Sequence, residues 1–167
     1  MSIFTTKTSH LTRLFEVAGA PDPQTWAKSE IDEGIPQLAR FLFLRQAWRL
    51  VVADSDVTWI DREIHQSEQK PNLPGAGLGH ALSRLLGAGA SREDLTELAR
   101  TLQWQLLHGM CYQLEDPSIE EPELKHVAWG LFEIDEEGNA GRSIHGLHES
   151  VLETDPTGRE MRPENTA

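Results

Sequence analysis

One long helical pattern between Ser91 and Pro117 constrains the fold more than any other feature of this chain. Ser91 is a favourable helix N-cap, and Glu93 and Asp94 place acidic side chains in the first turn, where the helix dipole favours them. Asp116 ends the pattern because the residue before a proline avoids the helical conformation. The sequence therefore predicts a helix over about residues 92–115 and a mainly α-helical fold.

Shorter segments with helical spacing of apolar residues surround this long helix. The segment 36–53 is the most apolar of them, and its polar residues share one narrow arc of the helical wheel, which is typical of a centrally buried helix. Glycine and proline separate the segments. We therefore predict a helical bundle of about five helices, with candidate segments at 9–18, 26–33, 36–53, 57–67, 80–86 and 92–115.

The hydrophobic period changes after the acidic linker 118–123. Residues 127–134 are rich in β-forming residues, 135–141 form a turn with glycine and asparagine, and 142–152 are expected to return antiparallel. This predicts a C-terminal β-hairpin at about 126–152, which has to pack on the helices or extend a partner's sheet, since two strands alone are marginally stable. We expect residues 1–153 to form a single domain and 154–167 a flexible tail.

Charge and composition narrow the possible partners. The chain of 167 residues has 15 basic and 27 acidic side chains, a net charge of −12 that disfavours nucleic acid and membrane surfaces and favours a partner with a basic surface. Cys111 is the only cysteine, so no disulfide forms within the chain. The N-terminus lacks the pattern of a signal peptide, and the apolar run 41–53 is too short to span a membrane. These features predict a cytoplasmic location.

The long helix has two distinct faces. Its main apolar stripe comprises Leu95, Leu98, Ala99, Leu102, Leu106 and Met110, whereas Trp104, His108, Cys111 and Glu115 fall within an arc of about 60° on the opposite side. A helix packed between two layers explains this pattern most simply, with Trp104 and Cys111 in the core. The alternatives are a partner-binding face or a reactive or metal site.

The metal alternative uses two short motifs. His108 and Cys111 form an H-x2-C pair, and His145 and His148 form an H-x2-H pair, a set of ligands that zinc accepts. Against this site, residues three apart in a strand point to opposite faces. A nucleophilic Cys111 is disfavoured because it lies near the C-terminal end of the helix, where the dipole raises the thiol pKa. The glycine run 75–79 resembles a phosphate-binding loop only weakly, and a flexible turn explains it better.

Two aromatic residues of the predicted hairpin lie among acidic runs. Trp129 and Phe132 are flanked by the acidic segments 116–123 and 133–137, and aromatic anchors with an acidic rim suit a basic protein surface. We therefore predict a non-enzymatic protein-binding domain, such as an inhibitor, an immunity-like protein or an adaptor, with homo-oligomers possible. Its expected contact residues are Trp104, His108, Glu115, Trp129 and Phe132. The alternative is a small metal-binding protein or metal-dependent enzyme that uses zinc at His108, Cys111, His145 and His148.

Overall fold

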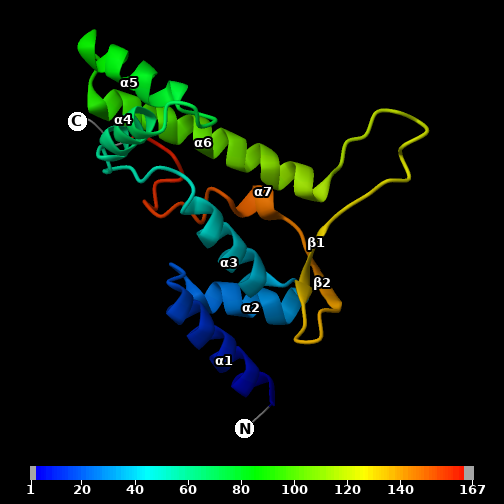
Figure 1. The fold of residues 1–167 in the computed structure, drawn as a ribbon. Helices are drawn as coiled ribbons and strands as arrows, with labels where there is room; N and C mark the ends of the chain where they lie inside the picture. The colour runs from blue at the N-terminus through cyan, green and yellow to red at the C-terminus, as the bar shows by residue number, and fades with distance from the viewer. Residues whose placement is uncertain (1–2, 164–167) are drawn as a thin grey trace. The chain divides into compact units, whose positions relative to one another are not determined.

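The protein is mainly helical, with one antiparallel β-hairpin near the C-terminus (Figure 1). The computed structural model describes the backbone of residues 3–163 and the side chains of residues 7–163. Within these residues, the elements are α1 (Ile3–Ala18), α2 (Pro23–Glu33), α3 (Gln37–Trp48), α4 (Trp59–Gln69), α5 (Gly77–Gly87), α6 (Arg92–Glu115), β1 (Leu131–Ile134), β2 (Ala140–Ile144) and α7 (Leu147–Ser150). The predicted fold class is confirmed, although the described residues form seven helices rather than about five.

The chain divides into two compact units. The terminal unit comprises Met1–Trp48 and Leu107–Ala167, and the central unit comprises Arg49–Leu106. Helix α6 contributes its first part to the central unit and its last part to the terminal unit. Residues 1–153, which the sequence predicts to be one domain, are shared between these two units.

No helix in the described part of the chain is both long enough and apolar enough to cross a lipid bilayer.

Three aromatic rings form the centre of the core between α1, α2 and α3. Phe15 lies 6.0 Å from both Trp26 and Phe41, measured between ring centroids, and Trp26 and Phe41 are 5.5 Å apart. Such separations allow the offset and edge-to-face contacts that aromatic pairs prefer. Asp22 begins α2 by accepting a hydrogen bond from the Thr25 amide at 3.2 Å, as an N-cap residue does.

The C-terminal segment packs against α3. The indole Nε1 of Trp48 donates to the carbonyl oxygen of Val151 at 3.0 Å and to Thr154 Oγ1 at 3.2 Å. Thr154 and Asp155 are buried, so the predicted tail begins with two packed residues. Asp155 also accepts hydrogen bonds from the amides of Thr157 and Met161. Residues 164–167 of that predicted tail lie outside the described residues.

The hairpin is shorter than predicted because the chain turns at Gly146. Strand β2 ends at Ile144, and α7 occupies part of the predicted return strand 142–152. Gly146 has φ = 71°, a left-handed conformation that glycine adopts without steric cost. A Cβ atom at this position would lie 2.1 Å from the guanidinium of Arg40, which donates to the carbonyl of His145 at 3.1 Å. The backbone angle therefore favours glycine here, and a side chain would displace the Arg40 guanidinium from its bond to His145.

The central unit has its own core, formed by α4, α5 and the first part of α6. Trp59, Ile60, Leu82 and Leu95 are buried together, and Trp59 Nε1 donates to Thr96 Oγ1 of α6 at 2.9 Å. Helix α3 stops at Trp48 instead of continuing to residue 53 as predicted, and Val52 packs against this second core. The amide of Val52 donates to Gln103 Oε1 at 2.7 Å, which fixes the segment before α4.

We predict that Gly146→Ala destabilises the protein by about 2–4 kcal/mol, because the methyl group adds overlap with Arg40 to the strain of a left-handed alanine. Gly138→Ala is the matched control, since Gly138 also has positive φ but has open space around its Cβ position. The control is expected to lose about 1–2 kcal/mol. Urea unfolding followed by tryptophan fluorescence measures the free energy of unfolding of both variants. Equal losses of stability in the two variants would contradict a steric role for Arg40.

Candidate functional site

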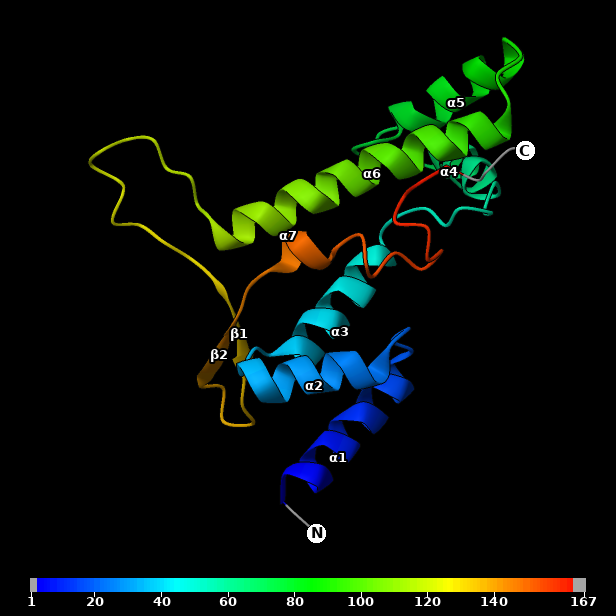
Figure 2. The ribbon, with the colours of Figure 1, turned by 180° about the vertical axis from the view of Figure 1, so that it is seen from behind.

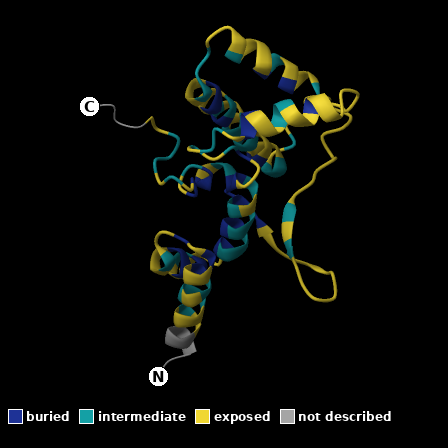
Figure 3. Ribbon diagram, turned by 60° about the vertical axis from the view of Figure 1, so that its left-hand side comes forward, coloured by how far each residue is buried: buried dark blue, intermediate teal, exposed yellow. Residues whose placement is uncertain are grey.

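The loop that leads into the hairpin and the hairpin turn are exposed (Figure 3). Three apolar side chains in and just before β1 are also exposed: Trp129, Phe132 and Ile134, at 50%, 43% and 64%. The register pairs Leu131 with Ile144 and Phe132 with Ser143, with an irregularity before Ile134 pairs with Ala140. Alternation along the strands turns Leu131 and Ile144 inward and leaves Phe132 and Ile134 outside. We call Trp129, Phe132 and Ile134 the hairpin patch.

A long loop between α6 and β1 carries acidic side chains that precede this patch in the sequence. It leaves the end of α6 and returns to the hairpin without regular structure (Figures 1 and 2), and residues 121–130 are all exposed. The indole of Trp129 donates to the carbonyl of Gln113 at 2.7 Å, so the end of the loop is fixed to α6. The loop carries Asp116, Glu120, Glu121 and Glu123, and the hairpin turn carries Asp135, Glu136 and Glu137.

The hairpin turn is held by its own side chains. The carboxylate of Asp135 accepts hydrogen bonds from the side-chain amide of Asn139 and from its backbone N–H at 2.8 Å. These bonds lower the pKa of Asp135, so its charge persists in acid. The turn therefore presents an ordered, ionised acidic residue beside Ile134.

An arginine fixes the hairpin to α2, and sequence analysis did not identify it. Arg142 donates through Nε to Glu133 at 2.7 Å and through its terminal nitrogen to Glu133 and to Glu30, both at 2.8 Å. Hydrogen bonding to Glu133, and then to Glu30, raises the pKa of Arg142. Glu30 is buried and also accepts from the Leu38 amide at 2.8 Å. No sequence spacing links residues 30, 133 and 142, so only the fold reveals this group.

Glu115, at the end of α6, binds the backbone at the start of α7. Its carboxylate accepts hydrogen bonds from the amide of Gly146 at 2.9 Å, from that of His148 at 3.4 Å and from that of Leu147 at 2.5 Å. Burial raises the pKa of Glu115, but the bonds from Gly146 and Leu147, with a contribution from His148, outweigh it and lower the pKa below its usual value. The Nδ1 atom of His148 lies 3.3 Å from this carboxylate.

Two further rings lie against His148. Tyr112 lies 5.2 Å and His108 6.3 Å from the His148 ring, measured between centroids and with edge-to-face geometry. Cys111 is completely buried on the same part of α6. Burial, and then the nearby Glu115 charge, raise the pKa of the Cys111 thiol to about 11. A thiol of this kind is protonated at neutral pH and is a poor nucleophile.

The predicted zinc ligands do not form a metal site in the described part of the chain. Among residues 7–163, no group of three or more histidine, cysteine, aspartate or glutamate side chains is placed to hold a metal ion. Cys111 is buried, whereas His145 is exposed and His148 faces Glu115. The zinc hypothesis for His108, Cys111, His145 and His148 therefore gains no support from their positions.

The five predicted contact residues separate into two groups. Trp129 and Phe132 are exposed on the hairpin patch, whereas Trp104, His108 and Glu115 are only partly accessible. The carboxylate of Glu115 is bound to backbone amides, which leaves little of it for a partner. Ile134 belongs to the exposed group, although its sequence context offered no reason to separate it from the core-facing residues of the strand.

Within the glycine run 75–79, Gly79 serves helix packing in this structure. A Cβ atom on Gly79 would lie 2.3 Å from Ser67 Oγ and 2.5 Å from the Glu63 carbonyl, so glycine permits α4 and α5 to approach closely. The Gly79 amide donates to Ser67 Oγ at 3.2 Å. This explanation replaces the phosphate-binding alternative.

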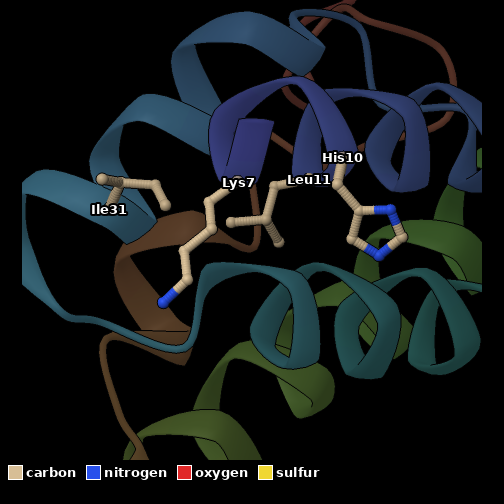
Figure 4. A pocket seen from close by; sticks show the side chains of 4 residues that line it. All are labelled: Lys7, His10, Leu11 and Ile31. Atoms are coloured by element: carbon tan, nitrogen blue, oxygen red, sulfur yellow. The ribbon is translucent and has the colours of Figure 1, made fainter. Parts of the chain in front are cut away.

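One open groove lies between α1 and α2 in the terminal unit. Lys7, His10 and Leu11 of α1 and Ile31 of α2 line it (Figure 4), and its surface is almost entirely apolar.

Comparison with protein-family models, with curated proteins and with solved structures found no match to this chain.

We predict that Glu115→Gln lowers the free energy of unfolding by about 1–3 kcal/mol at neutral pH, because a neutral amide accepts the backbone bonds less strongly. The pKa of Glu115 is lower in the folded state than its ordinary 4.5, so its stabilisation is complete above that value. The stabilisation is lost as the pH falls through the folded pKa. The difference between wild type and variant should therefore shrink in acid.

Urea unfolding at several pH values measures this difference. Glu120→Gln, in the exposed loop, is the control and should change stability by less than about 0.5 kcal/mol. A constant difference between wild type and Glu115→Gln from neutral pH to acid would contradict the proposed role of the ionised carboxylate.

We predict that Cys111 does not react with a water-soluble disulfide reagent in the folded protein at neutral pH. Its sulfur is buried, so the reagent cannot reach it. Its pKa is raised to about 11, so the reactive thiolate form is scarce at neutral pH. The absorbance of the thiolate that the reagent releases measures the rate at which the cysteine reacts. An added cysteine at exposed Ser143 should react at least a hundredfold faster, and equal rates for the two positions would contradict the burial of Cys111.

Proposed function

We propose that this protein is a non-enzymatic binding domain that uses its hairpin patch and acidic loop to hold a protein with a basic surface. The observation that carries the proposal is the exposure of Trp129, Phe132 and Ile134 in a segment that two acidic runs flank in the sequence. Large aromatic side chains provide most of the binding energy at many interfaces, because a partner's pocket removes them from water. An inhibitor, an immunity-like protein or an adaptor would use such a surface.

The distribution of charge supports a basic partner for the terminal unit. The sequence of this unit has nine basic and 19 acidic residues, whereas that of the central unit has six basic and eight acidic residues. Most of the net charge of −12 therefore belongs to the unit that carries the hairpin patch. Such a charge accelerates the encounter with a basic protein and repels acidic ones.

The contacts of the hairpin support a surface that keeps its shape. Arg142 connects Glu133 of β1 with buried Glu30 of α2, and Trp129 is bonded to Gln113 of α6. Anchoring both ends of the patch reduces the conformational entropy that binding would cost. The free edges of the two-stranded sheet offer further backbone groups to an extended segment of the partner.

The proposal is tested by affinity capture from the source cells with three immobilised forms of the protein. Wild type should recover a basic protein in stoichiometric amount, and the double variant Trp129→Ala, Phe132→Ala should recover at least tenfold less of it. Val17→Ala is the matched control, since Val17 is an exposed apolar residue of the same unit outside the patch. Raising the salt concentration should weaken capture by wild type.

Two results would overturn the proposal. One is recovery of the same proteins in equal amount by the double variant and by wild type. The other is an acidic captured protein whose retention does not depend on salt.

A further inference from the structure

A row of exposed leucines follows α6 within the central unit. Leu98, Leu102 and Leu106 are 56%, 57% and 67% exposed, although sequence analysis placed them in the main apolar stripe together with buried Leu95. Leu95 and Ala99 belong to the core with α4 and α5, which leaves the three leucines as the next row around the helix. We call Leu98, Leu102 and Leu106 the leucine row.

The centre of this row has no charged neighbours on the helix surface. The residues three and four positions from Leu102 are Leu98, Ala99, Gln105 and Leu106, and all of them are uncharged. Arg100 is buried and donates to the Val52 carbonyl at 2.9 Å, so it does not face outward beside the row. A partner that relied on basic side chains would find no carboxylate at the middle of this surface.

The charge distribution favours a second copy of this chain as the occupant. A two-fold interface places the same surface on both sides, so a charged surface would repel itself whereas a neutral apolar one complements itself. The central unit is nearly neutral, with six basic and eight acidic residues, and the strongly acidic terminal unit is unsuited to self-association.

We propose that the leucine row is a homodimer interface in which α6 packs antiparallel against α6 of a second copy. Residues spaced by four form a ridge on a helix, and two such ridges interlock at a crossing angle of about −50° with the axes about 8–10 Å apart. The two-fold axis then passes beside Leu102, which meets its own symmetry mate, and Leu98 lies near Leu106 of the second copy. The surface is small, so the dimer is weak and reversible.

Sedimentation velocity over about 1 μM to 1 mM protein tests this proposal. Wild type should change from monomer to dimer with concentration, and Leu102→Glu should weaken dimerisation at least tenfold, because two carboxylates then meet at the axis. Leu50→Glu is the matched control, since Leu50 is an exposed leucine of the central unit outside α6, and it should dimerise like wild type. Circular dichroism checks that each variant is folded.

Salt and crosslinking separate this dimer from capture of a basic protein. Added salt should strengthen dimerisation, because it screens repulsion between two copies of charge −12. Facing Cα atoms of helices packed at that spacing lie within disulfide reach, so oxidised Leu102→Cys should yield a covalent dimer and Leu50→Cys should not. A monomer at every concentration, an unchanged dissociation constant for Leu102→Glu, or equal crosslinking at both positions would overturn the proposal.

Discussion

The terminal unit depends on the bond between the Glu115 carboxylate and the backbone at residues 146–148. This contact connects the end of α6 with a segment more than thirty residues later in the chain, and the acidic loop and the hairpin lie between these two points. A carboxylate that accepts several backbone N–H groups is stable in its charged form even when partly buried. The start of α7 therefore receives from Glu115 the negative charge that a helix N-terminus favours.

Charged groups act together with buried apolar residues such as Leu147 and Val151 where the hairpin and the C-terminal segment meet the helices. Burial lowers the pKa of Arg40, while the surrounding carboxylates of Glu149, Glu153, Glu115 and Glu33 oppose that change. Burial raises the pKa of Glu153, and Arg40 opposes this in turn. A buried charge is costly without compensation, so removing one member of such a group costs more than its own bond. This cost makes a single arrangement of these segments favourable.

Sequence patterns predicted the helices and strands that are determined by residues close together in the chain. The cap at Ser91, the stop at Pro117 and the spacing of apolar residues located α6, and the change of period located the hairpin. The prediction of which face of α6 is buried was only partly correct, because Leu98, Leu102 and Leu106 are exposed whereas Cys111 is buried. Periodicity identifies an apolar face but not whether the same chain covers it. The contact of Arg142 with Glu30 spans 112 residues and that of Glu115 with Gly146 spans 31, and no local rule reports them.

The uneven distribution of charge decides what each exposed apolar surface can bind. Acidic runs flank the proposed hairpin patch in the sequence, so we expect a partner that binds there to bring cations as well as apolar side chains. The leucine row lies on a nearly neutral unit, so we expect an uncharged apolar surface to stabilise a complex there and cations on the partner to add nothing. Salt weakens the first kind of contact and strengthens the second between like-charged copies. The two proposed surfaces therefore suit different partners, because the carboxylates expected to select a basic protein are absent around Leu102 on the surface of α6.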